Sequence, residues 1–134
     1  MECIFCKIIK KEIPGHIIYE DDYTLAFLDI APVLPGHVLV VPKKHAVQLQ
    51  DVDDVMLCHT METVKKIAEA MKDTLGVKGY NIIVNNGETA GQLINHFHFH
   101  IIPRHKKEEL DPWSQGKYET GEAENIVKKI KAQL

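Results

Sequence analysis

Residues 96–104 read His-Phe-His-Phe-His-Ile-Ile-Pro-Arg, a strict alternation of imidazole and apolar side chains. Side chains two residues apart in a β-strand lie on the same face. The stretch therefore predicts a strand over residues 95–102 with histidines on one face and a core on the other: His96, His98 and His100 against Phe97, Phe99 and Ile101. Imidazoles can contact phosphate, ligate metal or act as nucleophiles near neutral pH. A strand that is only solvated would more naturally alternate Thr, Lys or Glu with its apolar residues, so we interpret the row as functional.

The rest of the chain predicts four more strands, over residues 17–20, 24–30, 37–41 and 80–85. Apolar residues recur at helical spacing from about residue 52 to residue 75 and predict one long helix, with Asp51 as its N-cap and Gly76 just past its end. A short helical turn is expected over residues 3–10.

The chain is expected to close with a short helix over residues 122–134. Its inner side would carry the apolar residues Ala123, Ile126, Val127, Ile130 and Leu134. Strands joined by hairpin-type links around one long helix indicate an α+β fold with a five-stranded antiparallel sheet.

Composition sets further limits. The chain has 134 residues, 45% hydrophobic and 26% charged, which predicts a single domain. Its net charge of −3 gives no basic footprint for a nucleic-acid polymer. We find neither a membrane-length apolar run nor a signal peptide and expect no membrane partner and a cytoplasmic protein. In that compartment three cysteines fit thiols or a metal better than disulfides.

Several residues could carry phosphate chemistry. His98, the middle imidazole, could attack phosphorus and form a covalent intermediate, while His100 could donate to a phosphate oxygen. The loop over residues 85–92 combines glycines with amide side chains and could contact an anion, although Asn86-Gly87 is also a common hairpin turn. Asp29, after an apolar strand, could accept hydrogen bonds from ribose hydroxyls, or it could be a turn residue.

Cys3 and Cys6 have the spacing of half a tetrahedral zinc site. The alternative is a pair of reduced, half-buried thiols. Spacing alone leaves the other two ligands open among several histidines: His16, His37, His45, His59, His96 and His105.

The motif His-φ-His-φ-His-φ-φ at residues 96–102, where φ is an apolar residue, resembles the signature of the histidine triad (HIT) superfamily, in its Hint-like branch. The similarity extends over about residues 3–104. It includes Cys-Ile-Phe-Cys-Lys-Ile-Ile at 3–9, Leu-Ala-Phe-Leu-Asp-Ile at 25–30 and Pro-Gly-His-Val-Leu-Val-Val-Pro-Lys-Lys-His at 35–45. The resemblance implies a single HIT domain over residues 1–134, in which residues 105–134 form a less similar C-terminal extension.

The resemblance also implies an activity. Members hydrolyse or transfer nucleoside monophosphates, cleaving phosphoramidates or dinucleoside polyphosphates at the α-phosphate through a nucleotidyl intermediate on the residue matching His98. Their sheet extends across a homodimer, with one purine nucleotide site per subunit. By position, His37, His96 and His100 complete the catalytic set. The matching nucleotide contacts are Asp29 for the ribose, Phe27 and Ile30 for the base, and Asn85, Gly91 and Gln92, with His98 and His100, for the phosphate.

Relatives with the same cysteine spacing imply a structural zinc held by Cys3, Cys6, His45 and His96, and no organic cofactor. Leu93 departs from relatives that carry a hydroxyl residue there and could supply no proton to a leaving group. Two other functions remain as hypotheses: a nucleotide-binding sensor or scaffold with incidental turnover, and a metallohydrolase with His96, His98 and His100 around an open metal. The leaving group and the choice between adenine and guanine stay open.

Overall fold

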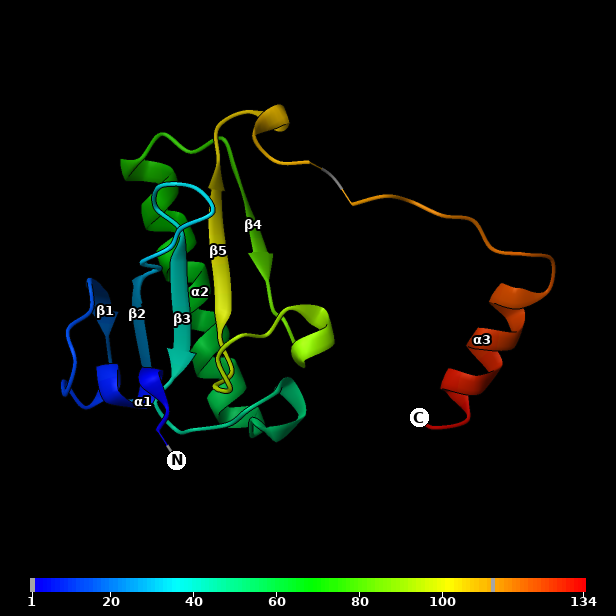
Figure 1. Ribbon diagram of the computed structural model, residues 1–134, viewed down its shortest axis with the longest axis horizontal. Coiled ribbons are helices and arrows are strands. Elements are labelled where there is room, and N and C mark those ends of the chain that lie inside the picture. The colour runs from blue at the N-terminus through cyan, green and yellow to red at the C-terminus, as the bar shows by residue number, and fades with distance from the viewer. Residues whose placement is uncertain (1, 112) are drawn as a thin grey trace.

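The computed structural model describes residues 2–111 and 113–134 and confirms the α+β class with a five-stranded antiparallel sheet (Figure 1). The strand order is β1-β2-β3-β5-β4, and every neighbouring pair is antiparallel. The strands are β1 (Ile17–Glu20), β2 (Thr24–Leu28), β3 (Val38–Pro42), β4 (Gly79–Ile83) and β5 (Phe99–Arg104). The helices are α1 (Ile4–Ile9), α2 (Asp54–Thr74) and α3 (Glu122–Lys131), with short 3-10 turns at Leu49–Asp51, Glu88–Ala90 and Lys107–Glu109.

The two faces of the sheet carry different layers. On one face α2 packs over Phe97, Phe99 and Ile101 in the larger core cluster. On the other face the short helix α1 packs Phe5 and Ile8 against residues of β2 and β3 in a second cluster. The apolar side chains of the predicted alternation therefore face α2, and the histidines face the α1 side of the sheet.

The N-cap of the long helix lies two residues later than predicted. Asp53 is the N-cap, and its carboxylate accepts a hydrogen bond from the backbone N–H of Met56 at 2.9 Å. Asp51 instead ends the preceding 3-10 turn, where its side chain accepts from Gln48 N–H at 2.9 Å. Gly76 follows the helix with a φ of 62°, which confirms its predicted place, because that left-handed conformation costs glycine little.

The histidine strand is shorter than predicted. Hydrogen-bonded pairing begins at Phe99, because the backbone N–H of Phe97 donates to Ala46 O at 2.7 Å, outside the ladder. His96 and His98 therefore lie on a segment just before β5. β2 also ends early, at Leu28, so Asp29 lies in the loop that follows it.

The C-terminal helix does not close the core as predicted. After the turn at Lys107–Glu109 the chain leaves the body, and Figure 1 shows α3 standing well apart from the sheet. No residue of α3 is buried. The prediction that its apolar side faces the core of its own chain is therefore wrong. Among the described residues, no helix combines the length and apolar character needed to cross a membrane.

Candidate active site and metal cluster

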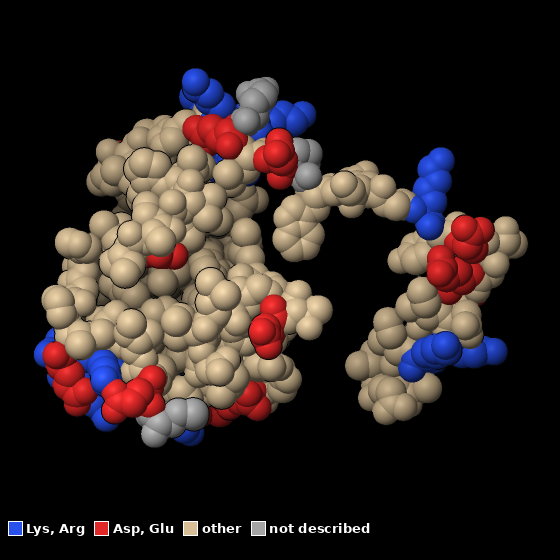
Figure 2. All heavy atoms as spheres, viewed as in Figure 1, with Lys and Arg blue, Asp and Glu red and all other residues tan. Residues whose placement is uncertain are grey.

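A cleft of about 430 Å³ lies on the α1 side of the sheet. Its walls come from α1, from the loop after β2 and from the segment before β5, and both His98 and His100 line it. Figure 2 shows this face as largely uncharged, with charged side chains gathered around its rim. The predicted residues Phe27, Asp29, Ile30 and Gly91 also line the cleft, whereas Asn85 and Gln92 do not.

His98 is buried and held in one tautomer. Its Nδ1 lies 2.6 Å from the carbonyl oxygen of His96, so Nδ1 carries the proton and donates it. Burial lowers the pKa of His98 below its ordinary value, which favours the neutral ring. The ring of Phe5 contacts it edge-on, with ring centres 5.1 Å apart. The lone pair is thus on Nε2, as a nucleophile requires.

A relay of hydrogen bonds places the proton of His100. The backbone N–H of Val33 donates to His37 Nδ1 at 3.1 Å, so the proton of a neutral His37 is on Nε2. That Nε2 lies 2.9 Å from His100 Nδ1 and donates to it, which leaves the His100 proton on its own Nε2. Burial lowers the pKa of His37, and it lowers the pKa of His100 to about 4, so both rings are neutral at neutral pH. His100 is therefore a neutral N–H donor.

Asp29 lies at the edge of this relay. Its Oδ2 is 3.7 Å from His37 Nε2, and its Oδ1 accepts a hydrogen bond from Ala31 N–H at 2.9 Å. The backbone N–H of Asp29 donates to His37 O at 2.9 Å, which ties the loop after β2 to the start of β3. A carboxylate in this position can accept from neighbouring hydroxyls of a bound ligand.

Side-chain hydrogen bonds of Asn85 and Gln92 stabilise the loop over residues 85–92. The side chain of Gln92 is buried, accepting from Gly87 N–H at 2.8 Å and donating to Val47 O at 2.6 Å and Ile94 O at 3.2 Å. Asn85 Nδ2 donates to Gly91 O at 3.5 Å. In this arrangement both amide side chains stabilise the loop, and Gly91 is the member that reaches the cleft.

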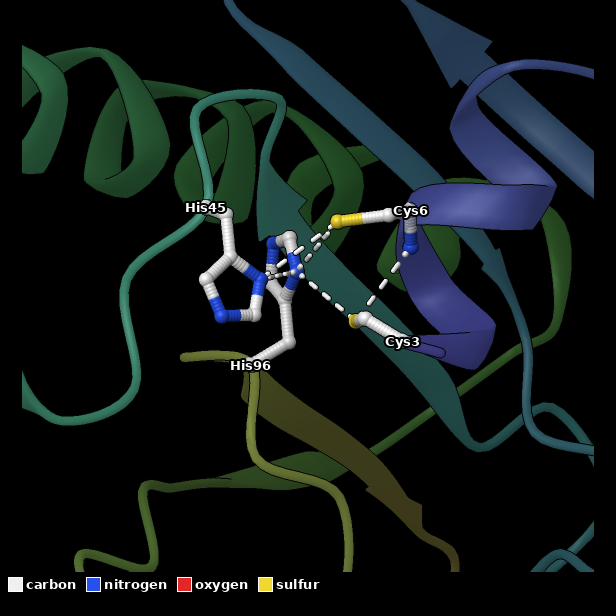
Figure 3. A group of neighbouring side chains, drawn as sticks. All are labelled: Cys3, Cys6, His45 and His96. Carbon is white, nitrogen blue, oxygen red and sulfur yellow. Dashed lines mark hydrogen bonds between the residues drawn. The ribbon is translucent and has the colours of Figure 1, made fainter. Parts of the chain in front are cut away.

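Four predicted metal ligands converge on one point, as Figure 3 shows: Cys3 at the N-cap of α1, Cys6 in α1, His45 after β3, and His96 before β5. His96 Nε2 donates to Pro42 O at 2.8 Å, so its Nδ1 lone pair is free. That Nδ1 lies 3.2 Å from His45 Nδ1, 3.4 Å from Cys3 Sγ and 3.6 Å from Cys6 Sγ. His45 Nδ1 lies 3.4 Å from Cys6 Sγ.

These separations fit a tetrahedral zinc ion. With zinc–nitrogen bonds of about 2.0–2.1 Å and zinc–sulfur bonds of about 2.3 Å, two nitrogens lie about 3.3 Å apart and a nitrogen and a sulfur about 3.6 Å apart. The donor set of two sulfurs and two imidazoles is also typical of structural zinc. Of the histidines left open by spacing, His45 and His96 join the cysteines, whereas His16, His37, His59 and His105 do not.

The sequence missed the wall that α1 gives to the cleft. Phe5 and Ile8 line it, and the same helix carries Cys6 and is capped by Cys3. The only available signal was the three-residue spacing of Phe5 and Ile8, which places them on one face of a helix.

Two other side chains at the cleft, Ile30 and Leu93, are 87% and 89% exposed.

Comparison with known proteins decides the family. A model of the HIT domain matches residues 10–107. The chain belongs to the HIT family. An uncharacterized HIT-like protein of Methanocaldococcus jannaschii is 56% identical over 104 residues, which are 78% of this chain and 80% of that protein. The chain is also 48% identical to an adenosine 5'-monophosphoramidase of Saccharomyces cerevisiae over 103 residues, which are 76% of this chain and 62% of that protein.

Solved HIT proteins share the fold. A crystal structure of a HIT family member from Bacillus subtilis superposes with a TM-score of 0.91 at 40% identity, covering 100% of this chain and 98% of that one. One from Bacillus anthracis gives 0.89 at 38% identity, covering 99% and 97%. A zinc-bound histidine triad family protein from Mycobacterium smegmatis gives 0.78 at 34% identity, covering 99% and 95%.

Proposed function

We propose that this HIT protein is a nucleotide-binding hydrolase or transferase that cleaves at the α-phosphate of nucleoside phosphoramidates or dinucleoside polyphosphates. The observation that carries the proposal is His98, whose Nδ1 is occupied by the His96 carbonyl at 2.6 Å, so that its Nε2 lone pair is available. The phosphoramidase name of the yeast relative supports the substrate class.

Each step follows from the tautomers. His98 Nε2 attacks the α-phosphorus, the phosphorus–nitrogen bond forms, and the bond to the leaving group breaks. His100 Nε2–H donates to a non-bridging oxygen as negative charge develops there. Leu93 holds no transferable proton, so the leaving group takes its proton from water. Water then attacks the phosphorus, the phosphorus–nitrogen bond to His98 breaks, and the nucleoside monophosphate leaves. The proton of the water passes to solvent, and the Nε2 lone pair of His98 is restored.

The remaining contacts orient the nucleotide. Phe27 and Ile30 pack against the base, and the Asp29 carboxylate accepts from the ribose hydroxyls. Gly91, with Asn85 and Gln92 behind it in the loop, lies on the phosphate side. An apolar base pocket packs either purine without reading its edge.

Zinc is proposed for the cluster of Cys3, Cys6, His45 and His96. When bound, it ties α1 to the segment before β5 and supplies no chemistry to the reaction. His96 would ligate the ion through its Nδ1, and its carbonyl oxygen accepts the hydrogen bond that fixes the His98 tautomer. Among the described residues, the groups that could hold a metal do not include His96, His98 and His100 together, which disfavours the metallohydrolase hypothesis.

A homodimer is proposed from the sheet edge. β4 is an edge strand, and its Tyr80 and Ile82 are 44% and 42% exposed. An exposed edge strand offers unpaired backbone groups to another chain. Pairing through this edge would extend the sheet across two subunits.

The test replaces the nucleophile. We expect His98→Ala to lose turnover of adenosine and guanosine phosphoramidates and dinucleoside polyphosphates while it keeps nucleotide affinity within a few fold. The wild-type protein, quenched during turnover, should carry one nucleotidyl group on His98 by peptide mass spectrometry.

The matched control is His59→Ala, which alters a half-buried histidine of α2 that stacks on Tyr23 and does not line the cleft. It should turn over at the wild-type rate. Full activity in His98→Ala would rule out the covalent route. Tight nucleotide binding without turnover of any substrate in the panel would instead favour a sensor or scaffold.

A further inference from the structure

Leu93 lies at the border between the active-site cleft and a second hollow. The hollow has a volume of about 320 Å³, and Ile4, Leu93 and Ile94 line both spaces. Leu93 is 89% exposed, so a ligand that extends from one space into the other can contact its side chain. The border between the two spaces is therefore apolar.

The proposed nucleotide contacts leave this border to the leaving group. Phe27, Asp29 and Ile30 line the cleft but not the hollow. When they hold the nucleoside and the α-phosphate lies at His98, the group on the other side of the phosphorus has the border and the hollow to occupy. Leu93 is thus among the residues that the leaving group contacts.

The cleft holds no acid for that group. Among the described residues that line it, the titratable side chains are Asp29, His98 and His100, and none carries a hydroxyl, a thiol or an amine. His98 Nδ1–H donates to the carbonyl of His96, and the Asp29 carboxylate accepts from Ala31 N–H. The neutral ring of His100 can donate a hydrogen bond through Nε2–H, but it does not give up that proton near neutral pH.

The hollow supplies no acid either. Its titratable side chains, within the described part of the chain, are Glu2, Cys3 and His45. Glu2 pairs with Lys7, and this ion pair lowers the pKa of the Glu2 carboxyl and keeps it ionised at neutral pH. Cys3 and His45 belong to the candidate metal cluster (Figure 3). A proton for the leaving group must therefore come from water.

Leaving groups differ in how much they need this proton. As His98 Nε2 forms its bond to phosphorus, the electron pair of the breaking bond passes to the leaving atom. A carboxylate or a phosphate keeps that pair as a stable anion, because the conjugate acids have pKa values of only about 4 and about 6. An amine nitrogen must instead gain a proton as it departs. Loss of an amine is thus the slow case in a cleft without an acid.

We propose that Leu93 is a specificity-determining residue, through which this cleft selects substrates whose leaving group departs from the α-phosphate as an anion. The favoured class comprises anhydrides and acidic esters of a nucleoside monophosphate, and it includes dinucleoside polyphosphates. Phosphoramidates of alkylamines are disfavoured. This assignment rests on the proposed function and narrows its substrate class.

The experiment compares three leaving groups on adenosine 5'-monophosphate: a second nucleotide in a dinucleoside polyphosphate, 4-nitrophenolate in an ester, and propylamine in a phosphoramidate. In the wild type we expect kcat/KM for the first two to exceed that for the phosphoramidate at least about a hundredfold, the lower end of what a positioned acid contributes. This constant isolates departure of the leaving group, because hydrolysis of nucleotidyl-His98 is common to all three substrates.

Two variants that differ by one oxygen atom test the role of Leu93. Leu93→Ser places a hydroxyl at the border, where it can pass a proton from water to the nitrogen, and Leu93→Ala is its matched control. We expect kcat/KM for the phosphoramidate to be about tenfold higher in Leu93→Ser than in Leu93→Ala. For the 4-nitrophenyl ester the two variants should agree within twofold.

The fraction of protein that carries a nucleotidyl group during turnover gives a second measurement. In quenched wild-type reactions, peptide mass spectrometry should find more nucleotidyl-His98 with the ester than with the phosphoramidate, because only the phosphoramidate is slow to lose its leaving group. Leu93→Ser should raise the fraction with the phosphoramidate alone. A purely structural role of Leu93 would change both fractions together.

The remaining outcomes separate this assignment from the proposed function. Equal kcat/KM for all three substrates in the wild type would overturn the assignment while cleavage at the α-phosphate stands. The same holds if Leu93→Ser and Leu93→Ala turn over the phosphoramidate equally fast. If the wild type turns over none of the three substrates, the proposed function itself fails, and the assignment fails with it.

Discussion

The position of the ring proton of His100 is set by residues that do not line the cleft. Its Nε2 is buried and has no hydrogen-bond partner among the described residues, although His100 lines the cleft. The proton is there because His37 donates to the other nitrogen, and His37 is itself fixed by the backbone of Val33. His37 therefore acts as a positioning residue.

We expect His37→Phe, which keeps a ring but removes both nitrogens, to lower kcat about tenfold and to change KM little. The expected loss is smaller than the roughly 10²–10³-fold typical of a lost oxyanion donor, because His100 remains and only its tautomer is released. Steady-state kinetics with a phosphoramidate substrate separate the two constants. A rise in KM at constant kcat would show that His37 serves binding instead.

At the scale of elements, α1 belongs to two sites at once. Cys3 and Cys6 belong to the candidate metal cluster. Phe5, which lies between them in the sequence, and Ile8, which follows them, line the cleft. Removing the metal should loosen α1 and with it one wall of the cleft. Burial and the neighbouring Cys3 thiol also raise the pKa of Cys6, so metal binding at neutral pH should release protons.

We expect Cys3→Ser/Cys6→Ser to contain no stoichiometric zinc by elemental mass analysis and to bind nucleotide several-fold more weakly, within the usual range of coupling between sites. Cys58→Ser is the control, since Cys58 is exposed on α2 and outside the cluster. Unchanged nucleotide affinity in the zinc-free protein would show that α1 lines the cleft independently of the metal, which would contradict the expected coupling.

The same elements show what the sequence could predict. Period-two alternation placed Phe97, Phe99 and Ile101 on the core side, because side-chain direction follows from the local backbone. It could not place the start of β5, which depends on a hydrogen bond from Phe97 to Ala46, a residue far away in the sequence. The relay through His37 and His100 was likewise invisible, because it joins two residues that are distant in the sequence, one just before β3 and one in β5. Phe5 was missed for the same reason.

For the whole molecule, the sequence predicted α3 correctly as an amphipathic helix but assigned its stripe to the wrong surface. A hydrophobic pattern indicates that a helix face is suited to burial. It does not indicate whether the surface that covers the face belongs to the same chain or to another. If two chains pair through their edge strands, as proposed, the stability of the protein depends on its concentration. We expect the apparent Tm to rise over a hundredfold increase in protein concentration. A Tm that stays constant in scanning calorimetry would contradict the homodimer.

If the proposed nucleotide site is correct, Ile30 and Leu93, two highly exposed aliphatic side chains that line the cleft, should contribute to the heat of binding. A bound ligand that covers them removes apolar surface from water, and such burial makes the heat capacity change negative. Binding enthalpy would then grow more favourable as temperature rises, while affinity changes far less. Ligands ranked by their calorimetric enthalpy at one temperature would be ordered in part by how much of Ile30 and Leu93 they cover.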